Sequence, residues 1–188
     1  MSNNCITERA LAASLKKLML TNPINRIHIK MITDDCGCTR HTFYNHFRDV
    51  YELLGWIYER EVIAGVDKYC TLSQWEEGLK LILEYTAENR IICINTYRSL
   101  GRDHLEAFLF RVFYGFLSSV IEDISQNMSL TAEVKKECCD FYANAIMGVF
   151  IAWLKKDLDE SPEKMLTHID RMLGGNIVNT LKKFSKQK

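Results

Sequence analysis

The segment CGCTRHTFYNHF, residues 36–47, sets polar and basic side chains around two phenylalanines four residues apart. Its polar groups are hydrogen-bond donors and acceptors, and none is a carboxylate. An arginine such as Arg40 can donate two hydrogen bonds to guanine, and an asparagine such as Asn45 can pair with adenine. The hydroxyls of Thr42 and Tyr44 suit phosphate oxygens. These side chains therefore have the chemistry needed to read a nucleic acid.

At 3.6 residues per turn, residues 39–47 form a helix with Phe43 and Phe47 on one face. His41 and Asn45 then point the opposite way. Small residues around Gly37 let the preceding helix approach closely, which predicts a helix-turn-helix suited to a major groove. The alternative is an ordinary helical corner whose polar face is merely solvated.

The remaining elements are also predicted to be helices, because the chain has only two prolines and nine glycines and mostly helical periodicity. The fold class is therefore all-α. Helix starts are indicated by capping patterns at Thr39, Asp49, Ser73, Asp103 and Ser161. We expect helices at about 7–20, 29–36, 39–47, 50–66, 74–89, 91–99, 104–126, 131–157 and 162–184, the last kinked or split at Gly174-Gly175.

Charge is distributed unevenly along a chain of 188 residues and zero formal net charge. Seven basic and four acidic residues fall within residues 1–50, which leaves a locally basic end. Such a basic N-terminal region can bind a polyanion without making the whole protein bind nonspecifically. Three of the five histidines lie in the same region.

Several other classes are disfavoured by the sequence. There is no secretory signal pattern and no apolar run near the ~20 residues of a membrane span, so we expect a cytoplasmic protein with no membrane partner. Its seven cysteines are then reduced thiols. No catalytic motif is recognisable, and we expect neither an enzyme nor a cofactor. A metal or redox sensor built on Cys36, Cys38 and His41, or on Cys138-Cys139, is an alternative, although the spacing does not favour a metal site.

Residues 27–54, IHIKMITDDCGCTRHTFYNHFRDVYELL, resemble the DNA-binding region of the TetR family of transcriptional regulators. The matching features are three isoleucines, Cys36-Gly37, Thr39-Arg40, Thr42-Phe43-Tyr44, Phe47 and Glu52-Leu53-Leu54. Within the family, TFYNHFRDVYELLGWIYE is most similar to the branch that regulates dihydroxyacetone kinase operons.

The resemblance implies a DNA-binding role for particular positions and double-stranded DNA as partner. A homodimer would bind a near-palindromic operator. The sequence departs from the family pattern at three positions. Val50 stands where a lysine is common, Asp49 would repel phosphates, and His41 is bulky. Because of these departures, an alternative interpretation stays open: a regulator with weak or lost DNA binding that acts through a protein partner. The implied DNA-binding residues are Lys30, Thr39, Arg40, His41, Thr42, Tyr44, Asn45 and His46.

The resemblance also implies three regions: a helix-turn-helix domain at 1–50, a connecting helix at 51–72, and a ligand-binding and dimerisation domain at 73–188. The last two helices would form a four-helix bundle with their symmetry mates, and their broad apolar surface is consistent with a second neighbour. The alternative is packing within one chain. The predicted dimer interface comprises Met147, Phe150, Ile169, Met172 and Leu173. Candidates to orient a small-molecule effector are Asn95, Tyr97, Arg98, His104, Arg111 and Tyr114.

Overall fold

The computed structural model describes residues 3–99 and 102–185, and every regular element within those ranges is helical. This confirms the all-α fold class. The chain divides into two compact units. Unit 1 comprises Met1–Glu61 and Asn89–Leu105, and unit 2 comprises Val62–Glu88 and Glu106–Lys188. The division differs from the boundaries expected from sequence, because the segment 89–105 groups with the N-terminal helices although it follows residue 73.

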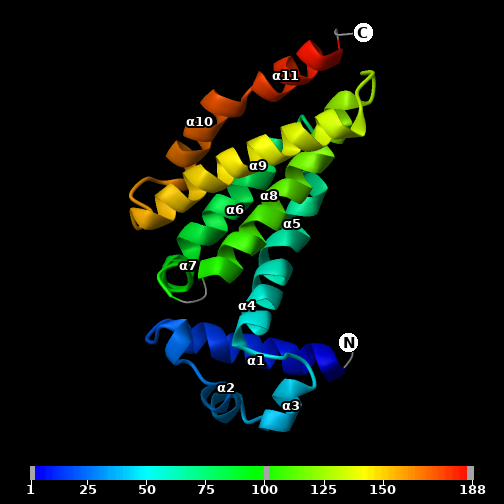
Figure 1. Ribbon diagram of the computed structural model, residues 1–188. Helices are drawn as coiled ribbons and strands as arrows, with labels where there is room; N and C mark the ends of the chain where they lie inside the picture. The colour runs from blue at the N-terminus through cyan, green and yellow to red at the C-terminus, as the bar shows by residue number, and fades with distance from the viewer. Residues whose placement is uncertain (1–2, 100–101, 186–188) are drawn as a thin grey trace. The chain divides into compact units, whose positions relative to one another are not determined.

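Unit 1 contains the predicted helix-turn-helix (Figure 1). Its apolar core is made of side chains that are at most 4% exposed, among them Leu11, Leu15, Ile32, Phe43, Phe47 and Leu53. Burying such side chains stabilises each of them by about 1.5–3 kcal/mol. The helices of unit 1 are α1 (Asn3–Met19), the 3-10 helix η1 (Ile24–Arg26), α2 (Ile29–Cys36), α3 (Arg40–Tyr44), α4 (Val50–Tyr58) and α7 (Arg90–Tyr97).

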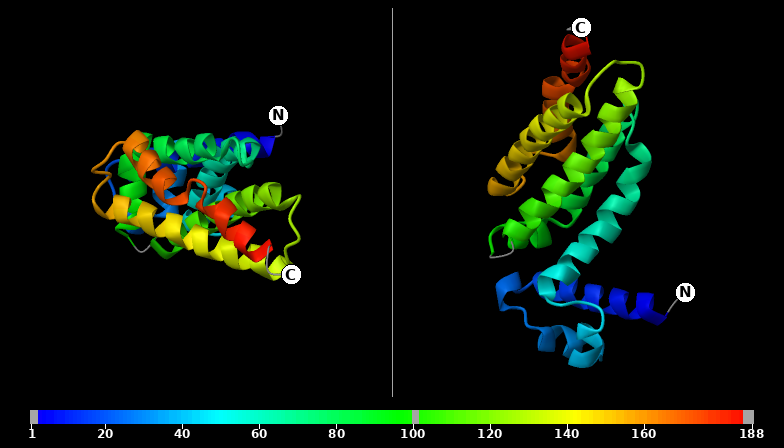
Figure 2. Two further views of the ribbon diagram at one scale, coloured as in Figure 1. Left: turned by 90° about the horizontal axis from the view of Figure 1, so that it is seen from above. Right: turned by 45° about the vertical axis from the view of Figure 1, so that its right-hand side comes forward.

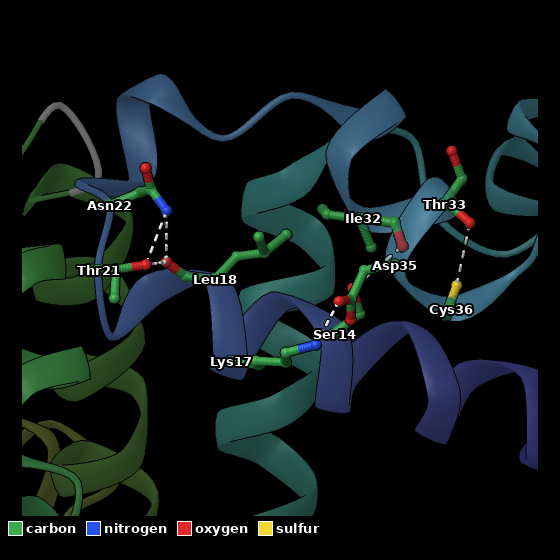
Figure 3. A network of polar contacts seen from close by, with 9 residues as sticks. All are labelled: Ser14, Lys17, Leu18, Thr21, Asn22, Ile32, Thr33, Asp35 and Cys36. Carbon is green, nitrogen blue, oxygen red and sulfur yellow. Dashed lines mark hydrogen bonds and ion pairs between the residues drawn. The ribbon is translucent and has the colours of Figure 1, made fainter.

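Polar contacts fix α2 against α1 (Figure 3). The buried Ser14 hydroxyl donates to the main-chain oxygen of Ile32 over 3.0 Å. Lys17 donates to Asp35 over 2.5 Å, and this hydrogen bond holds the pKa of Asp35 below its usual value. The orientation of α2 is therefore set by directional contacts as well as by apolar packing.

The turn between α2 and α3 depends on Gly37. This residue ends α2 in the left-handed region, at φ 70° and ψ 22°, and its N–H donates to the oxygen of Thr33. A side chain at this position would meet no atom within 4 Å, so the glycine is required by its dihedral angle and not by space.

Helix α3 ends earlier than the sequence analysis expected, at Tyr44 and not at Phe47. The amide of His46 bonds to the oxygen of Phe43 over 3.0 Å, which tightens the chain into a turn. The chain must then become extended at Asp49, with φ −154°, to cap α4. Phe43 and Phe47 nevertheless remain together, with ring centroids 6.0 Å apart.

Unit 2 is a bundle of longer helices, and α10 and α11 lie along α9 in the views of Figures 1 and 2. A π-helical segment, Glu59–Ile63, joins α4 to α5 across the boundary between the units. Phe150 packs between Phe113 and Trp153 in the bundle core. Its elements are α5 (Ala64–Val66), the 3-10 helix η3 (Asp67–Tyr69), α6 (Trp75–Glu88), α8 (Arg102–Ser125, whose first residues belong to unit 1), α9 (Ala132–Lys155), α10 (Pro162–Leu173) and α11 (Asn176–Ser185).

Two helix starts in unit 2 have a side-chain cap, and the one at Ser161 was predicted from the sequence. The predicted start after Ser73 is not observed, because α6 begins at Trp75. Thr131 and Ser161 accept hydrogen bonds from the amides of the first turns of α9 and α10, and Pro162 occupies the first helical position. The split at Gly174-Gly175 is confirmed, since α10 ends at Leu173 and α11 begins at Asn176. The cap at Asp103 is wrong, because α8 already begins at Arg102.

Helix α9 is the one helix, among the described residues, long and apolar enough to cross a membrane by length and composition. Half of its most apolar window is buried within the structure. The buried side chains of α9, such as Ile146 and Trp153, form part of the protein core.

Candidate nucleic-acid interface

The polar face of the helix-turn-helix is accessible. Six of the eight predicted DNA-contacting residues are exposed, and Thr42 is half-buried. Tyr44 is 59% exposed, with its ring edge-on to the buried Phe43. The anchoring and the contacting groups of α3 are thus separate side chains. The six exposed residues are Lys30, Thr39, Arg40, His41, Tyr44 and Asn45.

Thr39 and Thr42 order the start of α3. The Thr39 hydroxyl accepts the amide of Thr42 over 3.1 Å, and the two hydroxyls lie 2.9 Å apart. This confirms the predicted cap. One of the two hydroxyls donates to the other, so the threonine that accepts in this pair keeps its own proton to donate toward a phosphate.

His46 is placed differently from the other predicted contacts. Its side chain is only 11% exposed, and Nδ1 lies 3.5 Å from a carboxylate oxygen of Glu8 on α1. Because α3 ends at Tyr44, His46 lies in the turn after the helix and not on its exposed face. We therefore assign His46 to the packing of α3 against α1 and remove it from the groove-facing set.

The side chain of Asp49 caps the start of α4. Its carboxylate accepts the amide of Glu52 over 2.8 Å and contacts Nε of Arg48 at 3.3 Å. Partial burial opposes ionisation, but the Glu52 amide and the Arg48 guanidinium together lower the pKa of Asp49. The repulsion expected between this carboxylate and DNA is therefore partly offset by its own partners. The buried Val50 offers no polar group.

The predicted effector residues are divided between the two units. Asn95, Tyr97 and Arg98 lie in unit 1, whereas Arg111 and Tyr114 lie in unit 2. Asn95 bonds to main-chain groups, Tyr97 is buried with the guanidinium of Arg102 5.0 Å from its ring centroid, and Arg111 is exposed. Tyr114 is half-buried with its ring 5.8 Å from Phe110. The side chain of His104 lies outside the described residues.

An apolar cavity does exist in unit 2, at the junction of α10 and α11. Its lining contains none of the six predicted effector residues. An effector site at those residues thus stays a prediction. The cavity lining includes Leu72, Trp75, Leu117, Val120, Ile124 and Ile177.

The predicted dimer residues divide into core and surface. Phe150, Ile169 and Leu173 are at most 7% exposed within a single chain, so they cannot supply the main contacts to a second one. Met147 is half-buried and Met172 is 62% exposed. The interface prediction left out Phe141, which is 69% exposed on α9. Apolar periodicity alone cannot tell which apolar side chains neighbouring helices cover.

The cysteines contact protein groups. Cys36 and Cys38 donate weakly to the main-chain oxygens of Thr33 and Cys36, at 3.7 and 3.9 Å. Burial and the neighbouring Cys38 raise the pKa of Cys36, which disfavours the thiolate form that binds metals. Across the described ranges, no three His, Cys, Asp or Glu side chains gather as a metal-binding group.

An exposed polar recognition helix, held by a helix-turn-helix and followed by a helical bundle, defines a DNA-binding transcriptional regulator. Residues 73–175 match the TetR-type family described as "Transcriptional regulator C-terminal region". This match covers more than half of the chain, which therefore belongs to the TetR family of transcriptional regulators, and not to a class of enzymes.

The comparisons agree with the dihydroxyacetone kinase context expected from the sequence. The chain is 33% identical over 91 residues to the HTH-type dhaKLM operon transcriptional activator DhaS of Lactococcus lactis subsp. lactis strain IL1403. That match covers 48% of this chain and 49% of DhaS, so the chain spans about half the length of this relative. A solved structure of a dihydroxyacetone kinase operon activator DhaS is 25% identical, with 97% of this chain and 99% of the other covered and a TM-score of 0.73.

A more distant solved structure supports the fold alone. It is NalD, the secondary repressor of the MexAB-OprM multidrug efflux pump in Pseudomonas aeruginosa. The identity is 13%, the coverage 99% of both chains, and the TM-score 0.57. The similarity to the dihydroxyacetone kinase branch is thus confirmed, and both solved structures share the helical architecture.

Proposed function

We propose that the protein acts as a homodimer on a near-palindromic operator, each protomer reading one half-site with residues 39–45. The observation that supports this proposal is the exposed face of α3, which offers donors and acceptors without a carboxylate. Arg40 suits guanine and Asn45 suits adenine, while Lys30 and Arg48 add positive charge for phosphates. A two-fold dimer presents two such helices, and they reach successive major grooves when separated by about 34–36 Å.

The proposed dimer surface lies on α9 and α10. Along α9, exposed residues recur at helical spacing: Phe141, Ala145, Gly148 and Ala152. A Cβ on Gly148 would meet no atom of its own chain within 4 Å. Small residues let a second helix approach closely, and the exposed side chains of Phe141 and Met172 supply apolar area. Family membership favours this use of the last long helices.

We further propose a role in regulating genes of dihydroxyacetone metabolism in the cytoplasm. The similarity to DhaS, both in sequence and in its solved structure, supports this context. The effector is then a small three-carbon metabolite or a protein that responds to one. Thermal-shift measurements with dihydroxyacetone and its phosphate test direct binding, and a ligand that stabilises the protein also has to change its DNA affinity if it is the effector.

The DNA-binding proposal is tested by selecting duplexes from a library with about 30 random base pairs, a length that spans two half-sites whose centres lie about 10–10.5 base pairs apart, with flanks. Fluorescence anisotropy then compares the selected duplex with a scrambled one at two salt concentrations. We expect a near-palindromic selected sequence and an affinity that falls steeply with salt. A protein that selects no sequence even at low salt contradicts the proposal and favours action through a protein partner.

A further inference from the structure

The side chain of Asn95 on α7 joins three main-chain groups that lie more than 70 residues earlier in the sequence. Its Nδ2 donates to the oxygen of Met19 over 2.9 Å and to the oxygen of Asn22 over 2.6 Å. Its Oδ1 accepts the amide of Ile24 over 3.0 Å. Two carbonyls and one N–H surround the amide, so only one orientation of this side chain satisfies all three partners.

Two of these three groups belong to helix ends, and the third, the oxygen of Asn22, lies in the connection between α1 and η1. Met19 is the last residue of α1, whose final carbonyls have no partner within the helix. Ile24 begins η1, and the preceding Pro23 provides no side-chain cap for its amide. Asn95 thus serves as the cap for the end of one helix and the start of the next. Asn22 is additionally held by its own side chain, which donates to the oxygen of Leu18 over 3.1 Å (Figure 3).

The connection that Asn95 holds determines where the recognition helix lies. Ile24 and Ile27 are at most 4% exposed, and the chain passes from them directly into α2. Helix α2 leads through Gly37 to α3. A shift of the connection therefore changes the direction of α2 and, through it, the position of Arg40 and Asn45 in a groove.

A second contact holds α7 within the same unit. The hydroxyl of Tyr58 on α4 lies 3.1 Å from the buried hydroxyl of Thr96, the residue next to Asn95. Burial raises the pKa of Tyr58 well above its ordinary value, so this phenol stays protonated and able to donate. This hydrogen bond holds α7 against α4, so Asn95 is kept in position to bind the α1–η1 connection.

We propose that Asn95 is a positioning residue for sequence-specific DNA binding, acting through the connection between α1 and α2 and contacting neither DNA nor effector. The proposal rests on the DNA-reading function of α3. It assigns Asn95, expected from sequence to orient a ligand, to the alignment of the recognition helix.

Asn95→Asp tests this role because it keeps the acceptor for Ile24 and replaces both donors by a carboxylate facing two carbonyl oxygens. At pH 8 we expect affinity for the selected duplex to fall roughly tenfold or more, while affinity for the scrambled duplex is retained. At pH 5.5 part of the specific affinity should return, because a carboxyl forced against two carbonyl oxygens is readily protonated and can again donate.

Two further variants make the result decisive. Asn95→Ala removes all three bonds without a charge, so it should lose specific affinity to a similar degree at both pH values and show no recovery at pH 5.5. Asn127→Asp, in the exposed connection between α8 and α9, makes the same chemical change elsewhere and should behave as the wild type at both pH values.

Three outcomes are distinguishable. Wild-type protein that prefers no duplex refutes the DNA-binding function itself. Asn95 variants that keep the wild-type preference for the selected duplex refute the positioning role alone. Equal losses on selected and scrambled duplexes, accompanied by a loss of helical circular dichroism, show that Asn95 only supports folding and likewise overturn the proposal.

Discussion

Asn45 lies at the end of α3 with its side chain exposed, while the buried Phe43 anchors the helix. Asn45→Ala should therefore weaken operator binding by about 1–3 kcal/mol and relax the preference at one base pair. The melting temperature should stay close to that of the wild type, because Asn45 contributes no buried apolar surface. Anisotropy titrations against duplexes altered one base pair at a time measure both effects. A uniform loss across all duplexes would instead identify Asn45 as a phosphate contact.

Asp49 provides a test of the cap on α4. Since partial burial is outweighed by the bonds from Glu52 and Arg48, the folded pKa lies below the ordinary 3.8. The carboxylate thus stabilises the fold above that ordinary value and loses its effect as pH falls through the folded pKa. Asp49→Ala should cost about 1 kcal/mol at pH 7.

Urea denaturation at a series of pH values checks this expectation. The difference between wild type and Asp49→Ala should shrink below pH 3.8. Asp49→Asn is the matched control, because the amide oxygen can still cap the helix without a charge. A difference that stays constant down to the lowest pH would mean that the carboxylate's ionisation does not contribute.

Individual side chains show where sequence reasoning reaches its limit. The exposure of Arg40 and Asn45 was predictable, because it follows from helical periodicity around Phe43. The direction of His46 was not, because it depends on the turn that ends α3 at Tyr44. The role of Asn95 was not either, since its partners lie on another helix more than 70 residues away. Local patterns carry no information about such partners.

Close helix packing in unit 2 is concentrated at Gly78. A Cβ added there would lie 2.7 Å from the Phe116 ring and 3.2 Å from Cβ of Tyr69. Gly78→Ala should therefore destabilise the protein by about 1–3 kcal/mol through overpacking. Thermal denaturation measures the change.

Gly115→Ala on α8 is the matched control for Gly78, because a Cβ there meets nothing within 4 Å. Alanine favours helix, so this variant should gain about 0.4–1 kcal/mol. If both variants shifted the melting temperature equally, helix propensity and not packing would explain the Gly78 result.

Helix existence was more predictable than helix ends. The capping pattern at Ser161 located the start of α10, since its hydroxyl acts on an amide within the same turn. The split between α10 and α11 was also foreseeable, and a Cβ at Gly174 would lie 2.7 Å from the oxygen of Asp170. The early end of α3 was not, because it reflects the extended backbone that Asp49 adopts to cap the next helix.

For the whole molecule, the proposed dimer predicts separable effects of two substitutions. Phe141→Glu places a charge on an exposed apolar surface, so it should yield a folded monomer. Ile169→Asp places a charge in the core of one chain and should prevent folding, because Ile169 is 3% exposed. Sedimentation and circular dichroism distinguish the two results. A Phe141→Glu protein that sediments as a stable dimer contradicts the interface on α9.

Unit 1 is built from two stretches of sequence, and this affects its synthesis on the ribosome. The N-terminal helices leave the exit tunnel first, but α7, with Asn95, follows only after residues 62–88. At about 5–20 residues per second, the end of α1 and the start of η1 wait several seconds for their cap. Nascent chains arrested shortly before and shortly after the emergence of α7 should accordingly differ in how readily a protease cuts near Pro23.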